Sequence, residues 1–391
     1  MHPMATWEIG QGSRGRPLHG IRVLDLSRIV AGPHCTMVLG DLGADVVKVE
    51  PPAGDETRRW GPPFFGDTAA YYFAVNRNKR SVALDLKSRA GQQSLRELIM
   101  QADVLVQNFT ADVATRLHVD AKSVQTKNPR CIHVTLSGFG PEQPDRRGYD
   151  LLAQALGGLM SVTGERDGRG LKVGVPIADL TAGTYAAMAI VSALFDRNAS
   201  GRVACIEVSL IDGVTSLLAN QAMNWLLCES TPQPLGNDHP NVAPYGTFQT
   251  ATEDLVIAVA SDAQFVELCA AIGLPDLAAD ARFATNAGRV DHLEQLRVAL
   301  NSLFQSAPAG AWLKLLSAAG IPCGLVRTVP AALASDDVRS VTAVEHPVMG
   351  TIKQVLGPIR LNGRYLEPIL PPPTLDEHRA ELLARGPAAG G

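Results

Sequence analysis

Asp179 lies in a stretch of the chain that is otherwise apolar, between Val175-Pro176-Ile177-Ala178 and Leu180. A carboxylate is costly to desolvate, so an isolated one among Val, Ile, Ala and Leu either caps a backbone or takes part in chemistry. Residues 180–195 have the composition of a buried helix, and Asp is a favoured N-cap residue. The local sequence therefore leaves two hypotheses open: Asp179 is a helix cap, or it is a nucleophile.

Several short motifs accompany this aspartate in a fixed order along the chain. They are residues 18–28, Ala31-Gly32-Pro33, Gly54-Asp55, residues 76–81, Asn108-Phe109, Ser137-Gly138-Phe139-Gly140, Gly148-Tyr149-Asp150 and Gly236-Asn237-Asp238-His239-Pro240. Together they resemble the class III CoA-transferase family, to which formyl-CoA and carnitine CoA-transferases belong, over roughly residues 18 to 380. The resemblance places the catalytic aspartate of the family at Asp179 and so favours the nucleophile over the cap.

The resemblance also implies a set of CoA-binding residues. Matched to the formyl-CoA transferase pattern, the CoA-contacting positions are Val30, Ala31, Leu84, Lys87, Asn108, Phe109, Arg116, Leu136, Ser137, Gly138 and Phe139. One position departs from the pattern, because Pro51 stands where that enzyme has an arginine. CoA carries phosphates that call for cations and backbone donors, so we expect Arg58 or Arg59 to supply the missing charge. The basic cluster Arg77, Lys79 and Arg80 could serve the same end, or it could be a solvated face.

In the mechanism that the resemblance implies, Asp179 attacks an acyl-CoA and becomes an aspartyl-CoA thioester. A second carboxylic acid then takes the CoA from this thioester by the same steps in reverse order. The substrates are an acyl-CoA and an acceptor acid, and no metal or tightly bound cofactor is expected. Backbone N–H groups near Gly138, or at the start of the helix after Asp179, could hold the oxyanion. The segment Gly236-Asn237 resembles the glycine loop that closes over the site in this family, although an ordinary inter-domain turn has the same composition.

Two alternatives share the same fold. The α-methylacyl-CoA racemases exchange an α-proton with a His and Asp pair, and their histidine lies in a Gly-His-Asp motif. This chain has Tyr149 at that position, and a neutral tyrosine is a poor general base near pH 7. A CoA-binding protein without catalysis is the second alternative.

Other enzyme classes lack their motifs. Glu50, at the end of a predicted strand, is placed as in a dinucleotide-binding fold, but the first β-α turn, residues 27–33, has no G-x-G-x-x-G. The chain also has no G-x-S-x-G nucleophile elbow, which argues against a serine hydrolase. Its six cysteines are scattered singly, without spacing suited to zinc, and this predicts a reduced, cytoplasmic protein without a metal.

Composition limits the partners. Of the 391 residues, 46% are hydrophobic and 19% charged, and the formal net charge is -4, so no broad basic surface for nucleic acid is expected. No uninterrupted apolar stretch approaches the length of a membrane span, and residues 1–16 lack the apolar core of a secretory signal. We therefore expect neither nucleic acid nor a membrane as a partner.

The elements that must position these residues read as an α/β fold. Apolar runs at 21–26, 44–49, 81–86, 104–106 and 132–136 alternate with helical patterns, among them Leu95, Leu98, Ile99 and Ala102 on one helix face. This alternation predicts a large domain with a Rossmann-like, doubly wound parallel sheet. From about Tyr245 the pattern indicates a smaller α+β domain.

The predicted division of the chain is a large CoA-binding domain over 1–225, a small domain over 226–330 and a C-terminal segment over 331–391. The resemblance implies that this last segment returns to the large domain and that the protein is an interlocked, ring-like homodimer. Periodicity alone predicts neither.

The substrate is indicated by residues 54–64, Tyr71-Tyr72 and residues 76–81, which look most like the succinyl-CoA:glutarate type of CoA-transferase. A dicarboxylate acceptor keeps one carboxylate free, and an Arg fork is its best partner. The available arginines are Arg28, Arg58, Arg59 and Arg77. We expect succinyl-CoA as donor and a C4 to C6 dicarboxylic acid as acceptor.

Overall fold

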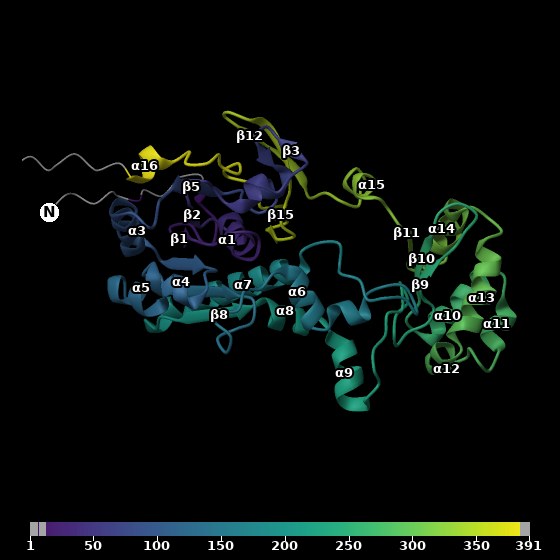
Figure 1. Cartoon of the computed structure of the whole chain (residues 1–391). Helices are drawn as coiled ribbons and strands as arrows, with labels where there is room; N and C mark the ends of the chain where they lie inside the picture. Colours follow the sequence, from purple (N-terminus) through teal and green to yellow (C-terminus); the bar gives the residue numbers. More distant parts are fainter. Residues whose placement is uncertain (1–6, 8–12, 384–391) are drawn as a thin grey trace, which may run out of the picture. The chain divides into compact units, whose positions relative to one another are not determined.

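The computed structural model describes Trp7 and residues 13–383. Contacts between residues divide the chain into two compact units. Figure 1 shows the chain coloured by residue number. The first unit comprises the chain up to Leu159, Val173–Leu218 and the chain from Ser340 onward, and the second comprises Met160–Lys172 and Ala219–Arg339. Residues 160–172 and 219–225, which were predicted in the large domain, and residues 331–339, which were predicted in the C-terminal segment, thus group with the second unit.

A six-stranded parallel sheet forms the centre of the first unit, in the order β5-β2-β1-β6-β7-β8. Its strands are β1 (Arg22–Asp25), β2 (Asp45–Glu50), β5 (Lys79–Ala83), β6 (Val104–Gln107), β7 (Ile132–Ser137) and β8 (Cys205–Ser209). The alternation of apolar runs predicted the first five, whereas β8 lies where no strand was predicted. The strand order reverses at β1, which has β2 on one side and β6 on the other, and such a switch point opens a crevice at the carboxyl ends of the strands.

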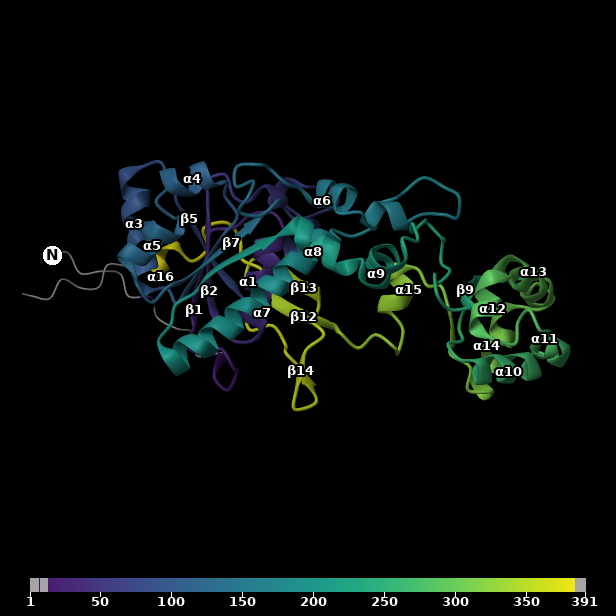
Figure 2. The same ribbon diagram turned by 90° about the horizontal axis from the view of Figure 1, so that it is seen from below.

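Helices cover both faces of this sheet (Figures 1 and 2). Neighbouring strand residues alternate between the two layers: Val23 packs with α1 (Ala31–Asp41) and α7 (Ile177–Ser200), whereas Leu24 packs with α3 (Arg89–Gln101) and α5 (Ala121–Lys127). The predicted helix face of Leu95, Leu98, Ile99 and Ala102 is confirmed, since all four are buried in the second layer. Burial on both faces explains why the strands read as continuous apolar runs.

Helix α7 bears on the expectation that no apolar stretch of the chain approaches the length of a membrane span. It is, among the described helices, the one long and apolar enough to cross a membrane by length and composition, with 39% of its most apolar window buried. A core helix passes the same test, and α7 packs closely against α1. A Cβ atom added to Gly183 would lie 2.5 Å from the carbonyl oxygen of Ala31. The small residues of α7 therefore let two helices approach, with Asp179 in the first turn.

The C-terminal part of the chain runs along the edge strand β5. Asn78 Oδ1 accepts hydrogen bonds from the backbone of Ile369 (2.6 Å) and Leu370 (2.9 Å), and Ala83 N–H donates to Asp376 (2.7 Å). This segment covers an edge that would otherwise expose unpaired backbone groups.

The remaining elements of the first unit are short. They are η2 (Glu56–Arg59), β3 (Phe64–Phe65), β4 (Thr68–Ala69), α2 (Ala70–Phe73), α4 (Ala111–Arg116), α6 (Asp150–Leu156), α8 (Leu210–Leu217), β12 (Val341–His346), β13 (Gly350–Val355), β14 (Arg360–Leu361), β15 (Arg364–Tyr365) and α16 (Arg379–Leu383), and η3 (Leu159–Val162) spans the boundary to the second unit.

The second unit has its own core around an antiparallel sheet in the order β11-β10-β9. Its elements are α9 (Ala219–Cys228), β9 (Tyr245–Phe248), β10 (Leu255–Ala258), α10 (Asp262–Ala271), α11 (Pro275–Ala279), α12 (Asn286–Asp291), α13 (Leu293–Phe304), α14 (Ala309–Ala318), β11 (Cys323–Leu325) and α15 (Val329–Leu333). The ring of Phe304 lies 5.7 Å from that of Phe248 and 5.2 Å from that of Trp312, which joins the sheet to two helices. The mixture of helices and strands predicted from about Tyr245 is therefore confirmed.

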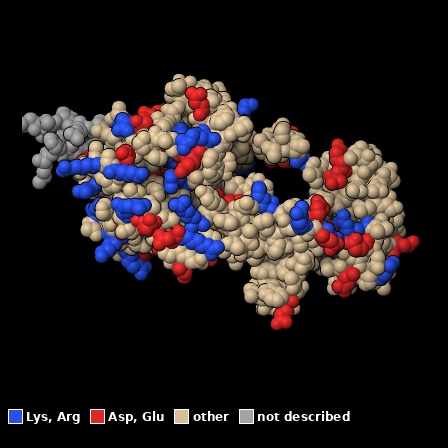
Figure 3. All heavy atoms as spheres, viewed as in Figure 1, with Lys and Arg blue, Asp and Glu red and all other residues tan. Residues whose placement is uncertain are grey.

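Charged side chains of both signs share the surface. On the face drawn in Figure 3, Lys and Arg gather over the first unit, where they are interspersed with Asp and Glu. Several other charges lie inside the first unit. Lys48 pairs with Asp55 at 2.9 Å and Lys79 with Asp25 at 3.1 Å, all four side chains being fully buried.

Candidate active site

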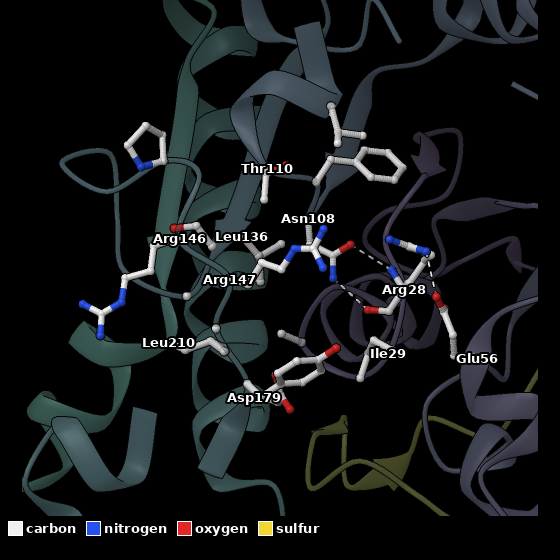
Figure 4. Close-up of a pocket in the computed structure, with 18 residues that line it drawn as sticks. Arg28, Ile29, Glu56, Asn108, Thr110, Leu136, Arg146, Arg147, Asp179 and Leu210 are labelled. Atoms are coloured by element: carbon white, nitrogen blue, oxygen red, sulfur yellow. Dashed lines mark hydrogen bonds and ion pairs between the residues drawn. The ribbon is translucent and has the colours of Figure 1, made fainter. Parts of the chain in front are cut away.

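A cavity of about 390 Å³ opens at the carboxyl ends of β1, β6 and β7, where the strand order reverses. The residues that line it are Arg28, Ile29, Ala31, Glu56, Asn108, Phe109, Thr110, Val113, Leu136, Ser137, Gly138, Pro144, Arg146, Arg147, Gly148, Tyr149, Asp179 and Leu210. All of them belong to the first unit. Figure 4 shows Arg28 and Asp179 projecting from different elements toward this cavity. We take it as the candidate active site.

The start of α7 decides between the two hypotheses for Asp179. The helix begins at Ile177, and its N-cap residue is Pro176, which has no side chain that could cap it. Asp150 performs that role instead, because its Oδ1 accepts a hydrogen bond of 2.8 Å from the backbone N–H of Ala178. Its other oxygen accepts from the buried Gln154 at 2.7 Å. The capping hypothesis for Asp179 is therefore wrong, and its carboxylate remains available.

Asp179 is a buried carboxylate without a stabilising partner. The residue is 8% exposed, and within the described part of the chain no side chain or backbone group donates a hydrogen bond to it. Burial, followed by the charge of Asp150, raises the pKa of Asp179 to about 7. The hydroxyl of Tyr71 belongs to the same surroundings: burial raises its pKa, and the charges of Asp179 and Asp150 raise it further. A weakly solvated carboxylate of this kind suits a nucleophile that must be ionised near neutral pH.

Two glycines let the walls of the cavity approach each other. A Cβ atom added to Gly138 would lie 2.5 Å from the Cα of Gly148, so the end of β7 and the loop before α6 touch backbone to backbone. This contact explains the glycines of the motifs around residues 137–140 and 148–150. It also places Gly138 and Tyr149 on the cavity that Asp179 lines.

The turn after β1 is held from two directions. The backbone N–H of Arg28 donates to Asn108 Oδ1 at 3.0 Å, and Asn108 Nδ2 donates to the Arg28 carbonyl oxygen at 2.8 Å. Ile29 has a positive φ of 72°, which is unusual for a β-branched residue, and its N–H lies 3.3 Å from a carboxylate oxygen of Asp55. The buried Lys48 pairs with that carboxylate. A buried network thus fixes the turn that carries Arg28.

The structure gathers only some of the residues that the resemblance assigned to CoA. Six of them line the cavity: Ala31, Asn108, Phe109, Leu136, Ser137 and Gly138. The other five lie elsewhere: Val30, Leu84 and Phe139 are buried, and Lys87 and Arg116 are exposed beyond the cavity. Phe139 packs under Arg146, whose guanidinium carbon is 3.7 Å from the ring centroid.

The basic cluster after residue 76 is neither a solvated face nor part of the cavity. Arg77, Lys79 and Arg80 are between 0% and 5% exposed, and each is paired with an aspartate. Arg58 is committed in the same way, with Nε 2.8 Å and Nη2 2.7 Å from the two oxygens of Glu50. Arg58 therefore does not replace the arginine missing at position 51. Both expectations for these cations are corrected by their ion pairs.

Arg146 and Arg147 were not among the predicted site residues, although both line the cavity. The available signal was their position just before the Gly148-Tyr149-Asp150 motif. The role of Asp150 as a cap was also missed, because its partner Ala178 lies 28 residues away. Among the described residues, no group of three or more His, Cys, Asp or Glu side chains could hold a metal ion.

Comparison with known proteins agrees with this geometry. A model of CoA-transferase family III matches residues 18–379. The succinate–glutarate CoA-transferase of Agrobacterium fabrum is 39% identical over 95% of this chain and 96% of its own length. The human succinyl-CoA:glutarate CoA-transferase is 34% identical over 94% of this chain and 85% of its own length. The crystal structure of a CAIB/BAIF family protein from Brucella suis matches with a TM-score of 0.82 at 37% identity, over 94% of this chain and 99% of that one. The chain therefore belongs to CoA-transferase family III.

Proposed function

We propose that this CoA-transferase moves CoA from succinyl-CoA to a C4 to C6 dicarboxylic acid through a thioester formed on Asp179. The observation that carries the mechanism is the buried carboxylate of Asp179, free of partners among the described residues, in a cavity at the sheet switch point. The names of the Agrobacterium and human relatives support the substrates, since both join succinate or succinyl-CoA to glutarate.

The reaction begins with attack of a carboxylate oxygen of Asp179 on the thioester carbonyl carbon of succinyl-CoA. The C–S bond breaks, and the products are a mixed anhydride and CoA thiolate. The thiolate then attacks the aspartyl carbonyl of the anhydride, which releases succinate and leaves aspartyl-CoA. The acceptor carboxylate attacks this thioester, and the returning thiolate attacks the acceptor's carbonyl carbon. Asp179 is regenerated, and no proton or ATP is consumed.

Every intermediate in this sequence is an activated acyl group, so the protein must provide position and exclude water. We assign the CoA channel to the predicted residues that line the cavity, from Ala31 to Gly138. Arg146 and Arg147 supply cations for the phosphates on the same wall, and the exposed Lys87 and Arg116 bind farther along the nucleotide. In the second unit, Gly236 has a positive φ of 62° and donates its N–H to Gly164 at 2.9 Å. The Gly236-Asn237 motif of the sequence therefore forms a turn in the second unit.

The proposal includes a homodimer of interlocked rings in the cytoplasm. The outward face of α7 supports the dimer, because it carries large apolar side chains without a cover in a single chain. Tyr185 is 46% exposed, Met188 59% and Phe195 77%. Apolar side chains grouped on one helix face are typical of subunit interfaces. All six cysteines are free, as a reducing compartment requires.

Trapping the intermediate tests the mechanism directly. Incubation with succinyl-CoA and then borohydride or hydroxylamine should modify Asp179, and digestion with mass spectrometry locates the adduct. Asp179→Asn keeps the shape but not the nucleophile, so it should show neither adduct nor transfer. The matched control is Asp196→Asn on the same helix, whose carboxylate pairs with Arg202 at the surface. Near-normal turnover of Asp179→Asn would refute the assignment.

A panel of acids tests the substrate. Oxalate, succinate, glutarate, 3-hydroxy-3-methylglutarate, itaconate, carnitine and an aromatic acid are each offered with succinyl-CoA, and new thioesters are detected by mass. We expect the highest kcat/KM among the C4 to C6 dicarboxylates. A clear preference for oxalate, carnitine or the aromatic acid would overturn the substrate and leave Asp179 and the fold intact.

A further inference from the structure

Of the four arginines that the sequence offered for the free carboxylate of a dicarboxylic substrate, Arg28 lines the cavity. We propose that Arg28 binds this distal carboxylate and that the substrate displaces Glu56, its partner in the free protein. The inference rests on the proposed function, because it names the residue that makes the transferase selective for dicarboxylic acids.

Three of the four candidate arginines are excluded by their contacts or their position. Arg58 and Arg77 are buried and hold both oxygens of Glu50 and of Asp41, respectively, so neither can turn to a substrate. Arg59 is exposed and does not line the cavity. Arg28 does line it, together with Asp179. One of the four candidates from the sequence therefore remains.

The main chain at Arg28 is rigidly placed. Asn108 binds both the N–H and the carbonyl oxygen of Arg28, and Asp55 holds the N–H of the next residue, Ile29, in its left-handed conformation. Such a conformation costs energy in a β-branched residue and persists where surrounding contacts impose it. The guanidinium carbon also lies 5.5 Å from the centroid of Phe109. Arg28 thus starts from a fixed point on the cavity wall, and its guanidinium pairs with Glu56 there (Figure 4).

The ion pair between Arg28 and Glu56 leaves one hydrogen-bond donor of the arginine and one acceptor of the glutamate without a partner among the described residues. It consists of one contact of 2.8 Å between Nη1 and Oε1, and the two side chains are 39% and 37% exposed. Among the described residues, Arg28 Nε and Glu56 Oε2 are buried side-chain atoms without a hydrogen-bond partner. An exposed pair of this kind is weak, whereas a carboxylate that binds the guanidinium through two parallel hydrogen bonds is strong. A substrate carboxylate can satisfy the unpaired Nε–H that Glu56 leaves open, and Glu56 is then released to water.

The same arginine serves donor and acceptor. The succinyl group carries a free carboxylate, and the released succinate and the incoming acid occupy the same place in turn. Arg146 and Arg147 line the same cavity from a different segment, the loop before α6, and the proposed function assigns them to the phosphates of CoA. Arg28 therefore distinguishes dicarboxylic from monocarboxylic groups without affecting the affinity for CoA itself.

The test compares substrates that differ by one carboxylate. Butyryl-CoA is succinyl-CoA with a methyl in place of the distal carboxylate, and valerate bears the same relation to glutarate. For Arg28→Gln we expect kcat/KM for glutarate, with butyryl-CoA as donor, to fall about 10- to 100-fold, the loss of a hydrogen-bonded charge pair. For valerate with the same donor, and for the KM of butyryl-CoA, we expect changes below about threefold. Arg202→Gln is the control, because this exposed arginine pairs with Asp196 and does not line the cavity, and it should change none of these values.

Glu56→Gln tests the displacement. Removal of the competing carboxylate should lower the KM for glutarate about two- to fivefold and leave valerate unchanged. An unchanged or higher KM for glutarate would contradict the exchange of partners. Thermal unfolding checks that each variant is folded, and Arg28→Lys, which keeps the charge but not the planar fork, should show a smaller loss confined to dicarboxylic substrates.

Other outcomes separate the alternatives. If Arg28→Gln raises the KM of butyryl-CoA and succinyl-CoA alike, Arg28 binds a CoA phosphate and the inference fails. If glutarate and valerate lose activity equally, Arg28 is structural and the inference fails as well. In both cases the proposed function survives as long as the wild-type protein transfers CoA to glutarate and Asp179→Asn does not.

Discussion

Asp150 accepts a backbone hydrogen bond from Ala178 at the start of α7, and its charge also raises the pKa of Asp179, the third residue of that helix. One carboxylate thus takes over the capping role that the other would otherwise fill. Its negative charge also disfavours ionisation of the neighbour, in the same direction as burial. The arrangement keeps Asp179 unbound and weakly stabilised, which is the state that a nucleophilic carboxylate requires.

The pH dependence of catalysis should follow from this pair. Because attack needs ionised Asp179, kcat/KM for succinyl-CoA should rise with pH and reach half its plateau near the pKa of about 7. Asp150→Asn removes the second cause of the raised pKa but keeps an oxygen that can accept from Ala178. The acid limb should then move to lower pH, as measured by initial rates between about pH 5 and 9. An acid limb that stays in place would show that the charge of Asp150 is not felt at Asp179.

Stability should respond to the same group with a defined sign. The pKa of Asp179 is about 7 in the folded chain against an ordinary value of 3.8, so the folded state holds the proton more tightly. Stability attributable to this group is therefore present at low pH and is lost as the pH rises toward 7. Asp179→Asn should be more stable than the wild type by at most about 4 kcal/mol at pH 8, and by less at pH 5. Urea unfolding at the two pH values measures the difference, and an equal difference at both would contradict the shift.

The contact between the two cavity glycines should not tolerate a side chain. Gly138→Ala places a Cβ 2.5 Å from the backbone of Gly148, where no flexible side chain can yield. We expect a loss of about 1–3 kcal/mol in the free energy of unfolding and a fall in kcat/KM of at least about tenfold. Gly310→Ala in α14 is the control, because a Cβ there meets nothing within 4 Å and alanine favours a helix. Thermal unfolding and steady-state kinetics measure the stability and the kcat/KM of both variants. If Gly138→Ala were as stable and as active as Gly310→Ala, the backbone contact between Gly138 and Gly148 would be contradicted.

The outward face of α7 should determine the association state. We expect the wild-type protein to sediment as a dimer, and Met188→Lys combined with Phe195→Lys to produce monomers or a failure to assemble, because two charges would be buried in an apolar interface. Val298→Lys in α13, at a side chain that is 71% exposed, should leave the dimer intact. A wild-type monomer in analytical ultracentrifugation would exclude the interlocked dimer.

The sequence by itself determined the local elements. Apolar runs of strand length alternating with amphipathic helices predicted the five strands from β1 to β7 that the structure places in the parallel sheet, because burial on both faces leaves a pattern in each segment separately. The motifs in their order likewise identified the family and singled out Asp179, although they could not say whether its carboxylate was free. The edge strand β8 was missed, since its residues are partly exposed and lack the continuous apolar pattern.

The tertiary structure decided which charges are available for chemistry. The sequence shows Arg77, Lys79 and Arg80 as one basic cluster, but their partners Asp41, Asp25 and Asp45 lie on elements that only the sheet order brings beside β5. Asp179 shows the converse. Its own surroundings in the sequence suggested a cap, and the residue that actually caps α7 is Asp150 at the start of α6, 28 positions away from Ala178. Pairing of charges and hydrogen bonds depends on distances across the fold, and those distances are set by packing and not by spacing along the chain.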